Sequence, residues 1–121
     1  MTTVGATGGG SCAGADFEAV ADQFVALRAT EQEKLRFPGV KFVLDGSIQG
    51  YSALLKEPGY YKGEDHGQLL TVPEQFLSWL RPFHKRSLNV HMHCNGNLTQ
   101  DLAIDTVAAV LREDPWLDHR H

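Results

Sequence analysis

Two short stretches of this sequence carry side chains that can bind metal ions or move protons. In residues 88–95 polar and apolar positions alternate, and the polar ones are Asn89, His91, His93 and Asn95. Neutral imidazole is a common ligand for zinc and related metals. In residues 40–44, Val40, Phe42 and Leu44 occupy alternate positions with Lys41 and Val43 between them, and Asp45-Gly46-Ser47 follows directly. Metal and substrate sites are built from residues of these types.

The alternation predicts that each stretch is a strand with one apolar and one polar face, since strand side chains point to opposite faces in turn. A parallel strand is normally covered on both faces, so the polar row formed by Asn89, His91, His93 and Asn95 needs a reason. It could face water at the edge of an open sheet, or it could face a barrel interior that holds a substrate or metal. Both strands end in polar loops, and parallel sheets place their sites at this end, which favours the second interpretation.

The elements that must position these strands alternate along the chain. Asp16 can cap a helix that runs to about Glu33, and a capping box formed by Thr71 and Glu74 can begin a second helix, which Pro82 is expected to end or kink. Thr99 can cap a third helix, which runs to about Arg112, and residues 118–121 are expected to open a further strand. Residues 48–70 form a long connection, and connections of this length are usually functional. Strands separated by more than forty residues with a helix between them indicate an α/β fold with parallel strands and helical crossovers.

Length and composition limit the possible functions. The chain has 121 residues and a net charge of −4 without a basic cluster, which disfavours nucleic-acid binding. No stretch is apolar enough to cross a membrane, and the glycine-rich residues 1–15 are expected to be a flexible lead-in rather than a signal. Cys12 and Cys94 are too far apart in the sequence to indicate a zinc ribbon or a disulfide scaffold, so a cytoplasmic location fits best. A complete (β/α)8 barrel needs roughly 200–250 residues, more than this chain has.

Five blocks of sequence, in order, resemble the middle of amidohydrolase family 3, a group of metal-dependent hydrolases that includes N-substituted formamide deformylases and has a TIM-type barrel. The resemblance covers residues 40–121. The blocks are residues 40–47, residues 49–53, Gly67-Gln68-Leu69, His93-Cys94-Asn95-Gly96-Asn97 with Asp105, and Arg120-His121.

The resemblance implies a role for several residues. Lys41 matches a strand-four lysine that can be carboxylated to bridge two metal ions, and His93 matches the single histidine ligand of strand five. Asp45 is the candidate catalytic residue, placed to orient substrate or neighbouring ligands, and Ser47 and Tyr51 are candidates for substrate binding. A bound metal, with zinc as the expected ion, would activate water to attack an amide-like carbonyl in a small molecule.

The resemblance also implies that residues 16–121 are a partial barrel domain of about two and a half βα units. The sequence departs from the family pattern at Asn97, where an acidic residue is usual. It also lacks the strand-one His-x-His pair, the strand-six ligand and the strand-eight aspartate. His91-Met92-His93 could be mistaken for the strand-one pair, but its place after Lys41 indicates strand five. With two plausible ligands, the chain alone is expected to be inactive.

Each of these residues also has a purely structural interpretation. Lys41 could be a strand-end lysine that extends to solvent, and His93 a hydrogen-bonded core histidine. His66, His84 and His119 are expected at the solvated surface, and Tyr51 either lines a pocket or holds the long loop. The alternative function is a non-catalytic α/β module that covers its sheet edges by forming a homo-oligomer.

Overall fold

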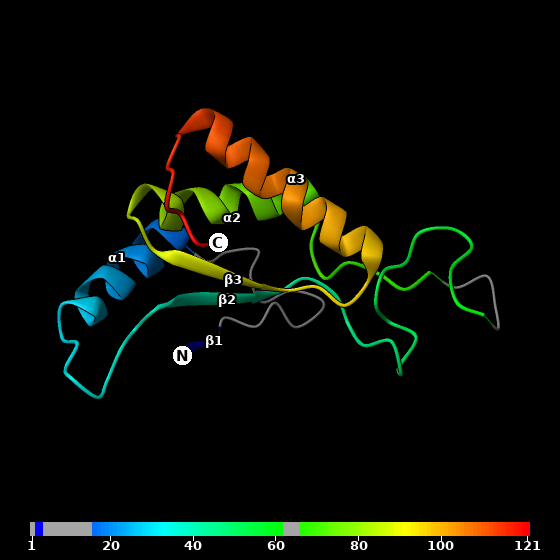
Figure 1. The fold of residues 1–121 in the computed structure, drawn as a ribbon, viewed down its shortest axis with the longest axis horizontal. Coiled ribbons are helices and arrows are strands. Elements are labelled where there is room, and N and C mark those ends of the chain that lie inside the picture. The colour runs from blue at the N-terminus through cyan, green and yellow to red at the C-terminus, as the bar shows by residue number, and fades with distance from the viewer. Residues whose placement is uncertain (1, 4–15, 62–65) are drawn as a thin grey trace.

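A computed structural model describes residues 2–3, 16–61 and 66–121 of the chain. Three strands and three helices alternate in this part (Figure 1). They are β1 (Thr2–Thr3), α1 (Phe17–Arg28), β2 (Gly39–Val43), α2 (Pro73–Lys85), β3 (Asn89–His93) and α3 (Asn97–Glu113).

The strands form one parallel sheet in the order β1-β2-β3. Val40 lies opposite Val90, and Val43 lies opposite His93. Because α2 lies between β2 and β3 in the chain, these three elements are a parallel strand–helix–strand unit. The predicted α/β class with parallel strands and a helical crossover is confirmed. The strand β1 was not predicted, and the rest of the expected lead-in lies outside the described residues.

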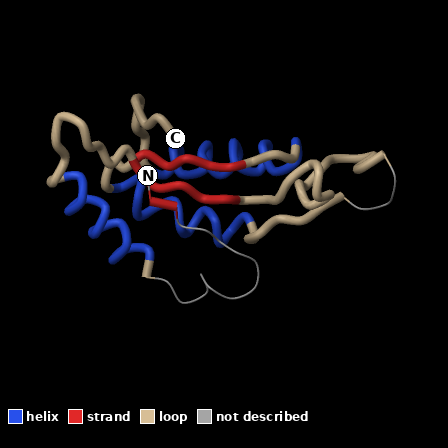
Figure 2. Tube along the Cα trace, turned by 90° about the horizontal axis from the view of Figure 1, so that it is seen from below, coloured by secondary structure: helices blue, strands red, loops and turns tan. Residues whose placement is uncertain are grey.

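All three helices lie on the same side of the sheet (Figures 1 and 2). The strand residues that face them are buried, with Val40 and Val90 completely so, and they meet a cluster of aromatic rings. In this cluster the ring of Phe42 stacks on Trp79 at a centroid distance of 6.1 Å and meets Phe83 edge-on at 5.7 Å. The apolar face predicted from the alternation is therefore confirmed, and the opposite face, which carries Lys41 and the histidines, lies away from the described helices.

Helix α1 begins as predicted, because the Asp16 carboxylate accepts hydrogen bonds from the backbone N–H groups of Glu18 and Ala19. It ends at Arg28 rather than near Glu33. Beyond the helix, a carboxylate oxygen of Glu31 accepts a hydrogen bond from the N–H of Phe37 at 2.9 Å. The chain turns here, and this turn replaces the last predicted turn of helix.

The predicted capping box at α2 is wrong, since the residue that caps this helix is Val72. The hydroxyl of Thr71 lies instead 3.1 Å from the side-chain oxygen of Gln75. Helix α2 also continues through Pro82 to Lys85. Pro82 is buried within the helix, although a proline there removes one backbone hydrogen bond.

The segment after α3 does not form the expected strand, but it lies along the outer edge of β3. The side-chain amide of Asn89 donates hydrogen bonds to the carbonyls of His119 and Arg120, and the N–H of Val90 donates to Nδ1 of His121 at 3.2 Å. His84, expected at the surface, is buried with 3% of its area exposed. The prediction was wrong because the chain beyond α3 folds back and covers this ring.

The hydrogen-bond partners determine where the protons of this histidine pair lie. The carbonyl of Asp114 can only accept, so His84 donates to it from Nε2 at 2.7 Å and accepts at Nδ1. His121 therefore donates from Nε2 to His84 Nδ1 at 2.8 Å, and its own Nδ1 accepts from Val90. A second proton on His121 would face the N–H of Val90 and break this chain of hydrogen bonds.

We therefore predict that stability falls as the pH is lowered from about 6.5 to 4. Burial, and then the nearby rings of His84 and His119, lower the pKa of His121 to about 4, whereas an unfolded histidine titrates near 6.5. Within this window the unfolded chain binds a proton that the folded chain does not, so acid favours unfolding. Because His121 is only half-buried, we expect a loss of about 1–2 kcal/mol.

The measurement is urea unfolding at pH 7.5 and pH 4.5. His121→Gln should lose this part of the pH dependence, whereas His66→Gln, at a ring remote from this cluster, should retain it. Equal pH dependence in the wild type and His121→Gln would contradict the prediction.

Candidate functional site

The carboxylate of Asp45 is buried where the loops that follow β2 and β3 meet. Only 1% of the residue is exposed. Oδ1 accepts from the N–H of Asn95 at 2.9 Å, and Oδ2 accepts from the N–H of Gly96 and the hydroxyl of Thr99, both at 2.7 Å. The N–H of Leu54 donates to Oδ2 as well, at 3.2 Å. One side chain thus joins the end of β2, the long connection, the end of β3 and the first turn of α3.

The position of Asp45 is electrostatically favourable because a helix N-terminus attracts negative charge. Gly96, the residue that caps α3, approaches the carbonyl of Leu54 so closely that a Cβ atom would lie 1.9 Å from its oxygen. Only glycine fits there. Thr99, expected to cap α3, lies instead within its first turn, completely buried, and donates its hydroxyl proton to Asp45.

This arrangement changes what is expected of Asp45. The alternation placed it in one row with Lys41 and Val43, but β2 ends at Val43 and the carboxylate is buried against α3. Both oxygens accept hydrogen bonds from this chain, so the contacts that the structure gives Asp45 are those of a residue that positions two loops. A direct part in catalysis stays a prediction.

The two candidate metal ligands do lie on the same face of the sheet. Lys41 is opposite His91 in the parallel register, and Val43 is opposite His93. From the spacing of strands and residues, the Cα atoms of Lys41 and His93 are about 8 Å apart. Within the described residues, no group of three or more His, Cys, Asp or Glu side chains could hold a metal ion. Lys41 and His93 are therefore at most part of a donor set.

The ring of His93 is held by Asn95, two residues along the chain. The amide nitrogen of Asn95 lies 2.9 Å from Nε2 of His93 and donates to the carbonyl oxygen of Gly46 at 2.8 Å. Sequence reasoning placed both side chains in the polar row but did not single out this contact. The signals were the polar residue type at position 95 and its place two residues after His93 on the same predicted face.

The candidate substrate residues Ser47 and Tyr51 lie in the loop that projects from the carboxyl ends of β2 and β3 (Figure 1). The hydroxyl of Ser47 accepts from the N–H of Gly50 at 3.0 Å, which closes a tight turn. Tyr51 is 55% exposed and its ring meets Tyr60 edge-on at 5.1 Å. A polar pocket of about 260 Å³ lies beside Tyr51, lined also by Ser52, Gly67 and Gln68. Both interpretations of Tyr51, in a pocket and as a loop anchor, agree with this geometry.

Cys94 is a poor candidate for a ligand or nucleophile. Burial, and then the negative charge of Asp45, raise the pKa of its thiol to about 11. Since the thiolate is the form that binds metals and attacks electrophiles, Cys94 is unreactive at neutral pH. Its side chain packs against the hydrophobic core.

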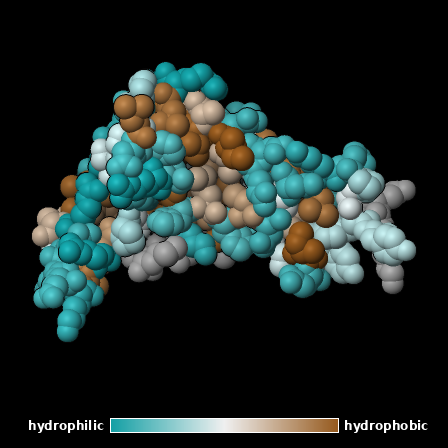
Figure 3. Space-filling view, in the orientation of Figure 1, coloured by the Kyte–Doolittle hydropathy of each residue, from teal (hydrophilic) through white to brown (hydrophobic). Residues whose placement is uncertain are grey.

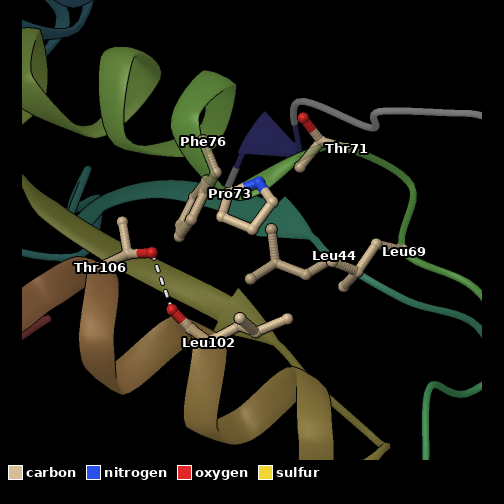
Figure 4. Close-up of a pocket in the computed structure, with 7 residues that line it drawn as sticks. All are labelled: Leu44, Leu69, Thr71, Pro73, Phe76, Leu102 and Thr106. Carbon is tan, nitrogen blue, oxygen red and sulfur yellow. Dashed lines mark hydrogen bonds between the residues drawn. The ribbon is translucent and has the colours of Figure 1, made fainter.

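A second cavity lies between the end of β2 and the helices α2 and α3 (Figure 4). It holds about 10 Å³, about the space of one water molecule, and apolar groups such as Leu44, Phe76 and Leu102 line it. The Thr106 hydroxyl at its wall donates to the carbonyl of Leu102. This cavity is a packing gap of the core and too small for a substrate.

The fold is similar to that of two metal-dependent hydrolases. Both hydrolases are uncharacterized and known from crystal structures. One is from Pyrococcus horikoshii OT3, with a TM-score of 0.64, and one is from Pyrococcus furiosus, with a TM-score of 0.65. Each is 26% identical to this chain and covers 76% and 77% of it, respectively. The chain spans about a fifth of the length of each hydrolase.

The other comparisons found no relative. No protein family matches the chain, and no curated protein matches it significantly. In the described residues, no helix combines the length and apolar character needed to cross a membrane.

We predict that Asp45→Asn destabilises the protein by about 3 kcal/mol, because an amide nitrogen would face donors that now meet a carboxylate oxygen. Asp105→Asn is the matched control, since Asp105 is exposed on α3, and it should change stability by less than about 0.5 kcal/mol. Urea unfolding followed by circular dichroism gives both values. Similar values for the two variants would show that the buried contacts of Asp45 are energetically unimportant.

Proposed function

We propose that this chain is part of a metal-dependent amidohydrolase of family 3, which hydrolyses the C–N bond of a small amide or formamide with metal-activated water. One observation supports this most directly. Lys41 and His93, the two candidate ligands, lie on the face of a parallel sheet opposite the described helices, in a fold similar to metal-dependent hydrolases. The more specific assignment to family 3 rests on the sequence blocks described above.

The architecture supports a place in a TIM-type barrel. In such a barrel parallel strands carry helices on the outside, and their inner faces and carboxyl ends form the site. The described helices lie on one side of the sheet (Figure 2), and the register and the burial of Val40 and Val90 toward the helices place the polar row on the other. We therefore propose that residues 16–121 are about two and a half βα units of a barrel, with the segment at His119–His121 lying where the next strand would run.

The residues present fit a divalent metal as a partial donor set. An ammonium group cannot bind a cation, but carboxylation of the Lys41 amine by CO2 releases a proton and creates an anionic oxygen ligand. Within the described part of the chain, Lys41 is partly exposed and no hydrogen bond or ion pair to its amine is found. His93 would supply an imidazole nitrogen. A bound metal, zinc in our proposal, would supply a water molecule whose pKa is lowered to about 7.

The other residues act around this pair. Asp45 holds the loops after β2 and β3 at a fixed separation and so keeps His93 in place through Asn95. Ser47 and Tyr51 lie on the loop at the same end of the sheet, where an amide-like substrate would enter. Their proposed role is to bind and orient this substrate.

We predict that the chain binds Zn²⁺ weakly and that bicarbonate, as a source of CO2, strengthens this binding. His93→Ala should weaken it at least about tenfold, a typical loss for a perturbed metal site, and Lys41→Ala should remove the effect of bicarbonate. Isothermal titration calorimetry measures both. His66→Ala is the matched control, because His66 lies in the long loop beside Glu57 and outside the polar row.

The variants also separate two kinds of site. If His91→Ala weakens zinc binding as much as His93→Ala while Lys41→Ala has no effect, the chelate is His91 with His93 and the lysine role is wrong. If His93→Ala binds zinc as the wild type does, the proposed metal site is wrong altogether.

The alternative, a non-catalytic module that oligomerises, is favoured by a different observation. Hydrophobic surface gathers over α3 and the segment that follows it (Figure 3), where Ile104 is 66% exposed and Leu117 fully exposed. If this surface joins copies of the chain, light scattering will show a defined dimer that Ile104→Lys converts to a monomer. A monomeric wild type would eliminate this alternative.

A further inference from the structure

In the contact between Asn95 and His93, the hydrogen-bond donor and the acceptor can be assigned. The Asn95 amide nitrogen lies 2.8 Å from the carbonyl oxygen of Gly46, and a carbonyl oxygen can only accept a hydrogen bond. The amide group is therefore oriented with its NH₂ toward Gly46, because the opposite orientation would place two oxygens against each other.

The same nitrogen lies 2.9 Å from Nε2 of His93. An amide nitrogen carries two protons and has no lone pair to offer, so its second proton points to Nε2. His93 must accept at Nε2, which means that in its neutral form the ring proton lies on Nδ1. The carbonyl of Gly46, through Asn95, thus determines the tautomer of His93.

The backbone at Asn95 is fixed independently of its side chain. Its N–H donates to Oδ1 of Asp45, and the next N–H, of Gly96, donates to Oδ2. Asn97, two residues further along the chain, uses its side-chain oxygen elsewhere, to accept from the N–H of Lys56 at 2.9 Å. The backbone of Asn95 is therefore held in place by Asp45, although the Asn95 side chain, which donates to His93, is exposed.

We propose that Asn95 is a positioning residue that fixes the tautomer and orientation of His93 and so makes Nε2 the nitrogen that bears the lone pair. The importance of this nitrogen rests on the proposed function, in which His93 binds a metal. A metal binds the nitrogen without a proton, and partners of a ligating histidine commonly decide which one that is. A metal bound at Nε2 would take the place of the Asn95 proton there, and Nδ1 would keep its proton.

The test is the tautomer of His93 in the metal-free protein, read from long-range ¹H–¹⁵N NMR correlations of the imidazole at a pH where the ring is neutral. We expect the Nδ1–H form in the wild type. Asn95→Asp substitutes a carboxylate, which can only accept, and should convert His93 to the Nε2–H form. Asn95→Ala should lose the preference for Nδ1–H, and Asn97→Ala, the matched control, should keep it.

An Nε2–H tautomer in the wild type, or an Nδ1–H tautomer that persists in Asn95→Asp, would overturn the proposal. Circular dichroism and the backbone amide spectrum establish that each variant is folded, and Asn95→Ala gives a second test if Asn95→Asp is not. A zinc titration of the same wild-type sample keeps the two proposals apart. If zinc changes the ¹⁵N chemical shift of Nε2 alone, both proposals are supported. Coordination through Nδ1 would overturn the role assigned to Asn95. If neither nitrogen shifts, the result counts against the metal site, and the tautomer result still decides the role of Asn95.

Discussion

The buried carboxylate of Asp45 is the interaction on which the rest of the site depends. Removing a charged carboxylate from water is costly, and a fold keeps one only where hydrogen bonds and favourable charges offset the loss. Here four donors and the N-terminus of α3 do so. The donors come from two segments far apart in the sequence, the long connection at Leu54 and residues 95–99. If any of them moved, the carboxylate would lose a partner that water could not replace.

The hydrogen bonds of Asp45 also help to position the polar row, because they hold the loop after β3. Asn95 and Gly96 are fixed by Asp45, and Asn95 in turn holds the ring of His93. On the helix side, the same sheet is anchored by the aromatic cluster around Phe42. The two faces of the sheet therefore differ in kind. One is fixed by packing, and the other is fixed at its carboxyl end by directed hydrogen bonds, which leave side chains accessible for chemistry.

Features set by local sequence could be predicted, and those set by distant partners could not. The alternation around Phe42 and Val90 correctly predicted the buried face, and Asp16 correctly predicted the start of α1, because each depends on neighbours in the chain. Thr71 and Thr99 are equally suited to cap a helix, yet neither does. The hydroxyl of Thr99 meets a carboxylate 54 positions away, a partner that no local pattern shows. His84 was misplaced for the same reason, since the residues that bury it lie beyond α3.

The register of the sheet bears on which histidine a metal would use. His91 lies directly opposite Lys41, whereas His93 lies one row further toward the carboxyl end. Side chains lean along the strand, and a carboxylated lysine is long enough for its oxygens to reach beyond the row of its own Cα. His91 is exposed, and within the described residues no hydrogen bond orients its ring, so binding a metal would require that ring to be ordered. Ordering a side chain costs about 1 kcal/mol, or about fivefold in affinity. Asn95 already orders His93, so we expect the more distant histidine to be the better ligand.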